Sequence, residues 1–140
     1  MKKFKDDQVL KTAFYLGGVY DLFLGVGLLF FSDLVVSILS ITKPDNMIFV
    51  QLTGLFLLFA GYCLCYAGYF DVKKMTFIGL GMVILRFSYL LIAIIGVINK
   101  DLELIYLVIG VSDAIMALVL LIPIILTEGT SVKQLWQYNN

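Results

Sequence analysis

Apolar residues along the chain are gathered in four long runs that are separated by short polar stretches. The runs cover about residues 9–31, 46–70, 73–98 and 102–126, and the second contains no charged residue. About 20 apolar residues in a helix are enough to cross the hydrocarbon core of a bilayer. The pattern therefore predicts four transmembrane helices. Because the connections are short, consecutive helices should be antiparallel neighbours in an all-α, up-down-up-down bundle.

Two further segments have patterns that suit the membrane surface. In residues 33–43, polar residues recur every three or four positions opposite an apolar face, which predicts a short amphipathic interfacial helix after the first span. The C-terminal tail, residues 127–140, carries Trp136 and Tyr138, two residue types that favour the headgroup region. For this tail, an interfacial helix and a frayed chain end are equal alternatives.

Composition agrees with a single membrane domain over residues 1–140. Hydrophobic residues make up 61% of the chain and charged residues only 14%, whereas a soluble domain carries about 25% charged residues. The formal net charge is zero, so no bulk attraction to nucleic acid is expected. The chain has no histidine, and Cys63 and Cys65 are two apart in a predicted helix, where they point in different directions. We therefore expect neither a metal site nor a cofactor.

Lysines near the two ends of the predicted bundle are distributed unevenly. Seven fall at the end that carries both termini, namely Lys2, Lys3, Lys5, Lys11, Lys73, Lys74 and Lys133. Only Lys43 and Lys100 fall at the other end. Loops rich in lysine and arginine stay on the cytoplasmic side of a membrane. The distribution predicts a multi-pass protein of a bacterial-type inner (plasma) membrane with both termini in the cytoplasm.

Three ionisable residues interrupt the apolar runs near their middles: Asp21 in the first, Arg86 in the third and Asp113 in the fourth. A charge at the bilayer centre costs several kcal/mol unless it has a partner or faces a polar cavity. Because the three residues fall at similar depths, we expect Arg86 to pair with both carboxylates in a buried network. Tyr89 follows Arg86 by about one helical turn, so its hydroxyl is predicted to donate to one carboxylate.

Each span also carries a row of mainly small or polar residues at alternating steps of three and four, which keeps the row on one helix face. The rows are Phe14, Gly18, Asp21, Gly25, Leu28 and Ser32; Gln51, Gly54, Leu58, Gly61, Cys65 and Gly68; Gly79, Met82, Arg86, Tyr89, Ala93 and Gly96; and Tyr106, Gly110, Asp113, Ala117 and Leu120. Small residues select the inward face of a membrane helix because they let backbones approach closely. The rows predict one closely packed bundle.

Two uses of the network remain open. With two carboxylates and one guanidinium, the cluster carries one excess negative charge, so one carboxyl should hold a proton at neutral pH, or a cation or water should compensate. The network is then either a polar clasp that fixes helix register, or a ligand or proton site at Asp21 and Asp113. Gln51, near the outer end of the second span, is expected to bond across helices or to line an outward-facing pocket of that site.

No motif in the chain specifies a reaction, and the residues of hydrolytic and metal-dependent sites are missing, so we expect no enzyme. The leading hypothesis is a non-enzymatic integral membrane protein, an accessory subunit or small binding module that meets a membrane-protein partner or a second copy within the bilayer. The alternative is a protein that translocates a proton, an ion or a small solute, in one form as a dimer.

The stretch Gly54-Leu55-Phe56-Leu57-Leu58-Phe59-Ala60-Gly61, which leads to a basic turn at Lys73-Lys74, resembles the DoxX-like group of small bacterial four-helix membrane proteins. The resemblance covers about half of the chain. It implies four compact spans and, as for some members of that group, a role as a subunit of a quinone-linked oxidoreductase. The Asp–Arg–Asp network is not a pattern carried over from that group.

Overall fold

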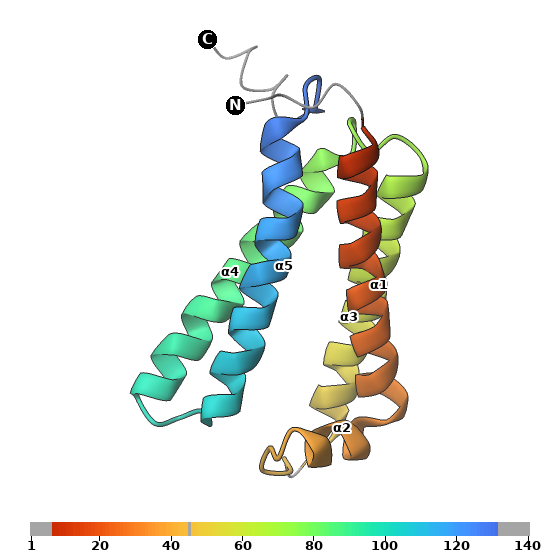
Figure 1. The fold of residues 1–140 in the computed structure, drawn as a ribbon. Helices are drawn as coiled ribbons and strands as arrows, with labels where there is room; N and C mark the ends of the chain where they lie inside the picture. Colours follow the sequence, from red (N-terminus) through yellow and green to blue (C-terminus); the bar gives the residue numbers. More distant parts are fainter. Residues whose placement is uncertain (1–6, 45, 132–140) are drawn as a thin grey trace.

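The structure, a computed structural model, describes residues 7–44 and 46–131. Its five helices are α1 (Gln8–Phe30), α2 (Ser32–Ile38), α3 (Ile48–Tyr69), α4 (Thr76–Ile98) and α5 (Leu104–Leu126) (Figure 1). By length and composition, α1, α3, α4 and α5 are each suited to cross a membrane. The predicted all-α architecture with four spans is confirmed.

The predicted spans match the helices closely, with the largest difference at the start of α4. This helix begins at Thr76, because the preceding residues form a turn in which the backbone N–H of Lys74 donates to Asp71 Oδ1 at 3.2 Å. At the other end of the chain, residues 127–131 follow α5, and the backbone N–H of Ser131 donates to Lys73 O at 2.8 Å. Trp136 and Tyr138 lie outside the described residues, so the prediction for the tail stays open.

The interfacial helix is present but shorter than predicted. α2 ends at Ile38 rather than near residue 43, and Ser40 has a left-handed backbone conformation with φ of 52°. Such a conformation cannot continue a right-handed helix, which explains the early end. Within α2, Val36 is buried, whereas Leu34 and Ile38 are exposed as expected for a helix whose apolar side faces lipid.

α1 and α3 form the most closely packed pair of helices, and glycines make this possible. Gly18 and Gly25 of α1 lie against Gly61 and Gly54 of α3, respectively. A Cβ atom added at Gly61 would lie 2.7 Å from the carbonyl oxygen of Gly18, and one at Gly25 would lie 2.8 Å from that of Gly54. The two backbones are therefore in direct contact, as the small-residue rows predicted for this pair.

α4 and α5 form a second hairpin with larger side chains at its interface. Gly110 of α5 packs against Leu90 and Ala93 of α4, and Leu102 in the connecting turn packs against Gly96. A Cβ at Gly110 would lie 3.2 Å from Leu90 Cδ1, so this contact is made with side chains more than with backbone. The rows thus pack mainly in pairs, within each hairpin.

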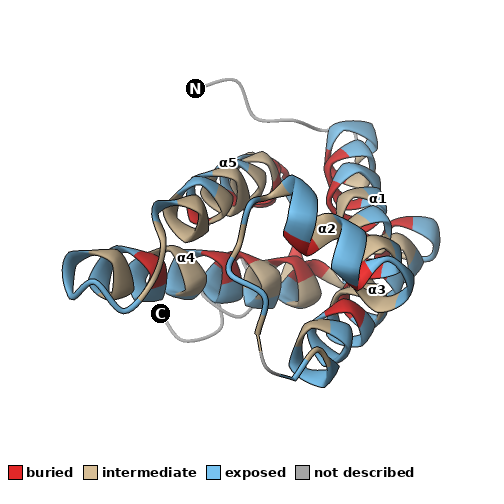
Figure 2. Ribbon diagram, turned by 90° about the horizontal axis from the view of Figure 1, so that it is seen from below, coloured by how far each residue is buried: buried red, intermediate tan, exposed pale blue. Residues whose placement is uncertain are grey.

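The two hairpins meet mainly at the end of the molecule where α1 begins and α5 ends, and they diverge toward α2 (Figure 1). Phe14 of α1 sits over Gly79 of α4 at this end, and the buried apolar cluster draws on all four long helices. Its members are Leu10, Ala13, Phe14, Leu64, Ala67, Val72, Val83, Ala117, Leu120 and Ile124. Seen from the α2 end, buried parts of the helices turn toward one another (Figure 2).

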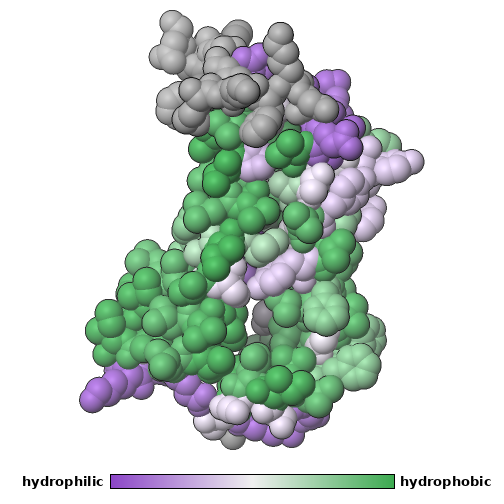
Figure 3. Space-filling view, viewed as in Figure 1, coloured by the Kyte–Doolittle hydropathy of each residue, from purple (hydrophilic) through white to green (hydrophobic). Residues whose placement is uncertain are grey.

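At the opposite end, a polar contact joins the hairpins. The backbone N–H of Thr42, in the connection after α2, donates to Glu103 Oε1 at 3.1 Å, and the Thr42 hydroxyl donates to the same oxygen. Glu103 immediately precedes α5. Between this contact and the buried cluster, the surface is hollowed between the hairpins, and apolar side chains cover both sides (Figure 3). The hairpins are therefore in contact at both ends of the bundle, and they are separated over part of the length between these contacts (Figure 3).

Candidate functional site

The three ionisable residues within the spans meet at the place where the hairpins begin to diverge. Arg86 Nη1 donates to Asp113 Oδ1 at 2.8 Å, and Arg86 Nη2 donates to Asp21 Oδ1. The Arg86 side chain is 4% exposed and that of Asp21 only 1%, whereas that of Asp113 is 21% exposed. The predicted buried network is confirmed, and Arg86 bonds one oxygen of each carboxylate.

Helix geometry places these residues together. Asp21 lies about 20 Å along α1 from Gln8, Arg86 about 15 Å along α4 from Thr76, and Asp113 about 20 Å along α5 from Leu126, at about 1.5 Å per residue. All three distances start from the same end of the bundle. The apolar cluster occupies that end, so the network is the boundary between the shared core and the diverging parts of the hairpins.

A tyrosine supports the network, but it is Tyr20 rather than Tyr89. The Tyr20 hydroxyl donates to Asp113 Oδ1 at 3.4 Å and lies 3.2 Å from Ser112 Oγ. Its ring centroid lies 5.2 Å from Arg86 Cζ, within the range of a cation–π contact. Tyr89 makes no hydrogen bond with any residue that the structure describes. Spacing along α4 from Arg86 does not indicate Tyr20, because Tyr20 reaches Asp113 through the packing of α5 beside α1, and this packing depends on how the helices are arranged.

Two polar atoms of the network have no partner among the described residues. They are Asp21 Oδ2 and Arg86 Nε, and both are buried. Nε and Nη2 lie on the same edge of a guanidinium, which is the edge that binds a carboxylate in a two-bond fork. Arg86 uses only one of these two donors on Asp21. A buried polar atom without a partner costs about 1–3 kcal/mol, so the network has unused hydrogen-bonding capacity.

Gln51 lies apart from the network. It is exposed, and its side chain makes no hydrogen bond within the described part of the chain. Gly61, the α3 residue that packs against Gly18 and Leu22 beside Asp21, is ten residues farther along the helix, or about 15 Å. The structure therefore brings Gln51 neither to the two carboxylates nor to a bond across helices, because Gln51 lies in the first turn of α3, far along the helix from the level of the network.

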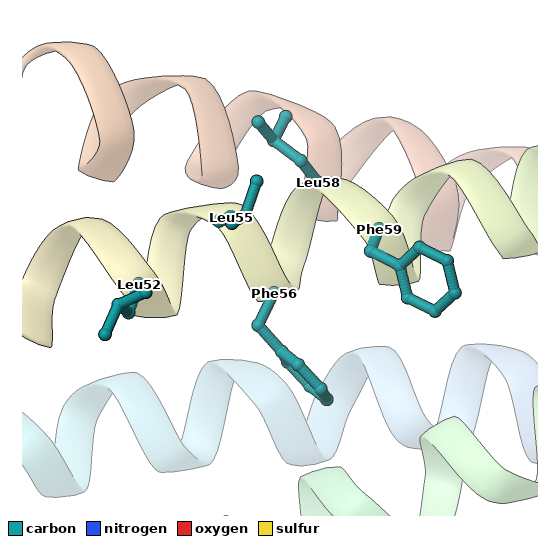
Figure 4. A pocket seen from close by; sticks show the side chains of 5 residues that line it. All are labelled: Leu52, Leu55, Phe56, Leu58 and Phe59. Atoms are coloured by element: carbon teal, nitrogen blue, oxygen red, sulfur yellow. The ribbon is translucent and has the colours of Figure 1, made fainter.

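A groove of about 600 Å³ on the surface is lined by Leu52, Leu55, Phe56, Leu58 and Phe59, all on α3. Figure 4 shows Leu58 directed toward α1, with Phe56 and Phe59 on the other side of the helix. Because one helix supplies the whole lining, this groove belongs to the lipid-facing surface.

A smaller groove, of about 290 Å³, follows the seam between α1 and α5. Its lining consists of Gln8, Val9, Thr12, Ala13, Leu16, Val119 and Pro123. Leu16 precedes Tyr20 by one helical turn, so the groove ends close to the side of the network where Tyr20 and Asp113 meet.

The described residues contain no group of three histidine, cysteine, aspartate or glutamate side chains that is arranged to hold a metal ion. A comparison with protein families, with curated proteins and with solved structures finds no match. The function must therefore be inferred from the site itself. The site is a buried, incompletely bonded charge network within four apolar helices.

Proposed function

We propose that the chain is a non-enzymatic integral membrane protein, a small binding module or accessory subunit whose working part is the Asp21–Arg86–Asp113 network. The observation that carries this proposal is the unused bonding capacity of a network that is open to one side. A clasp that only fixed helix register would gain from a complete fork between Arg86 and Asp21. Instead, two polar atoms are unpartnered and Asp113 is partly exposed.

The proposed setting is a bacterial-type inner membrane with both termini in the cytoplasm. Lys11, Lys73 and Lys74 lie at the end where α1 begins, and Lys43 and Lys100 lie at the other end. This distribution supports the orientation through the preference of basic loops for the cytoplasm. In the proposed orientation, the apolar cluster would lie in the cytoplasmic half and the diverging parts of the hairpins in the outer half.

Native mass spectrometry of the protein released from mild detergent tests the proposed binding function. We expect a noncovalent added mass, either a small molecule or a partner chain, that is lost in Asp113→Asn and in Asp21→Asn. The matched control is Asp33→Asn, which removes an exposed carboxylate that pairs with Lys43 and should leave the added mass in place. A parent protein without added mass, or one whose added mass is the same in all three variants, would contradict the proposal.

Proton translocation is the second candidate, and a specific observation favours it. The two carboxylates lie on either side of one guanidinium, but one is sealed and the other is 21% exposed. Such an arrangement suits a proton that enters at Asp113 and passes toward Asp21. Proteoliposomes with an internal pH-sensitive dye decide between the candidates. Flux above that of empty liposomes, abolished in Asp21→Asn and Asp113→Asn, would establish a relay, whereas the binding function predicts no such flux.

A further inference from the structure

We propose that Asp113, together with Tyr20 and Ser112, forms a binding site for a small organic cation with an apolar body, which lies in the seam between α1 and α5. The inference rests on the proposed binding function and names the chemical class of its ligand. A quaternary or protonated amine that carries an aromatic or short alkyl group is the simplest member of that class.

Charge identifies the class. Within the described long helices, the charged residues are Lys11, Asp21, Arg86 and Asp113. Lys11 lies in the first turns of α1, where it pairs with Asp7 at 3.2 Å. When both carboxylates are ionised, the remaining three carry two negative charges and one positive charge, which leaves one excess negative charge at the centre of the bundle. A buried charge without compensation is strongly destabilising, and a cationic ligand would neutralise it.

Geometry places the ligand at Asp113. Of the three charged side chains, that of Asp113 has the greatest exposure, at 21%. Its Oδ1 accepts bonds from Arg86 and Tyr20, whereas its Oδ2 makes no hydrogen bond with any described residue. A carboxylate can accept about four hydrogen bonds, so this side chain has capacity for a further positive partner. The hydroxyls of Tyr20 and Ser112 lie beside it, 3.2 Å apart.

The unpartnered atoms show how the network would accommodate such a ligand. When a cation neutralises Asp113, Arg86 is free to move its Nη1 away from that carboxylate. Its Nη2–Nε edge can then form both bonds of the fork with Asp21, which gives a partner to Asp21 Oδ2 and to Arg86 Nε. The result is two neutral pairs, one between Arg86 and Asp21 and one between Asp113 and the ligand. Both atoms that lack partners in the free protein are satisfied.

The seam between α1 and α5 offers a place for the apolar body. The groove of about 290 Å³ is lined chiefly by Val9, Ala13, Leu16, Val119 and Pro123. Sites for small molecules have volumes of about 300–1,000 Å³. The groove is slightly smaller and open to the surface, so it suits only a small apolar group. Leu16 connects the groove to Tyr20 by one turn of α1. An apolar body in the groove would therefore hold its charged group near Asp113.

The test uses two probes of the same shape in nanodiscs of zwitterionic lipid. Benzyltrimethylammonium carries the positive charge, and neopentylbenzene is its neutral isostere. We expect the cation to raise the unfolding temperature by several degrees at saturation, with an apparent affinity that falls at least tenfold in Asp113→Asn. Asp33→Asn should keep the parent affinity. An equal response to both probes, or an unchanged affinity in Asp113→Asn, would overturn the proposal.

A second variant keeps the test decisive if Asp113→Asn does not fold. Leu16→Trp fills the seam and leaves all three charged side chains in place, so it should weaken binding of the cation at least tenfold. Binding as tight as in the parent would contradict the placement in the seam. If the cation does not bind but the native added mass still depends on Asp113, the ligand class is wrong and the binding function stands. If both measurements fail, both proposals fall.

Discussion

The interface between α1 and α3 and the interface between the two hairpins are built on different principles. Within the first hairpin, glycines bring the backbones together, and a Cβ at Gly54 would lie 2.6 Å from the backbone nitrogen of Leu29. Between the hairpins, Arg86 reaches across to Asp21, with an apolar cluster on one side of the network only. One interface relies on close contact of small residues, and the other combines an apolar cluster at one end with a charge network beside it.

This difference has a physical consequence for motion. Steric packing of glycines has one good arrangement, because any shift along the helices brings a larger residue into the contact. A guanidinium between two carboxylates has several arrangements that differ in which oxygens it bonds. The α1–α3 hairpin should therefore behave as a rigid unit, and changes on binding should occur where α4 and α5 meet it.

The largest expected effect is that of Arg86→Leu, which removes the charge between the hairpins. Two carboxylates would be left in an apolar environment, and loss of one partner from a buried ion pair costs about 3–5 kcal/mol. Unfolding in lipid nanodiscs measures this loss. The matched control is Lys43→Leu, because Lys43 is exposed and pairs with Asp33 at the surface, and its removal should change stability by no more than about 0.5 kcal/mol.

Next in size is Gly61→Ala, which tests the interface built by close contact. The added methyl group would lie 2.7 Å from the carbonyl oxygen of Gly18, and overpacking of this kind costs about 1–3 kcal/mol. Gly81→Ala is the control, because a Cβ at that position meets nothing within 4 Å. If both variants unfolded under the same conditions as the parent, close backbone contact between α1 and α3 would be wrong.

A smaller effect is expected for Tyr20→Phe, which removes the hydroxyl that bonds Asp113 and Ser112. Loss of a typical hydrogen bond lowers the free energy of unfolding by about 0.5–1.5 kcal/mol. Tyr89→Phe should have no measurable effect if Tyr20 alone supports the network. Chemical denaturation of the two variants side by side makes the comparison, and a larger effect for Tyr89→Phe would reverse the assignment.

The smallest effect concerns the turn that links the hairpins. A hydrogen bond and charge attraction from Lys74 hold the pKa of Asp71 below its usual range. A lowered pKa in the folded state contributes stability above the ordinary pKa, and that contribution is lost as the pH falls through the folded value. Asp71→Asn should therefore remove a small part of the acid sensitivity. NMR titration of the Asp71 carboxyl would contradict this account if its pKa were normal or raised.

The sequence contained much of this arrangement. Hydrophobic runs located the four spans. The positions of Asp21, Arg86 and Asp113 predicted that these three side chains pair, because an unpaired charge within a membrane is costly. It did not distinguish Tyr20 from Tyr89, since that choice depends on which side of α1 faces α5. Nor did the sequence show that the hairpins diverge, because a row of small residues indicates the inward face of a helix but not which other helix packs against it. For the same reason, the sequence did not show that Gln51 lies far from the network.

A rescue experiment shows whether charge joins the two hairpins at mid-depth. Unfolding in nanodiscs is compared for the parent, for Arg86→Leu, and for the triple variant Asp21→Asn, Arg86→Leu, Asp113→Asn. The single change should be severely destabilising, whereas the triple change leaves no uncompensated charge and should regain most of the lost stability. A single variant as stable as the parent, or a triple variant no more stable than the single one, would contradict the account.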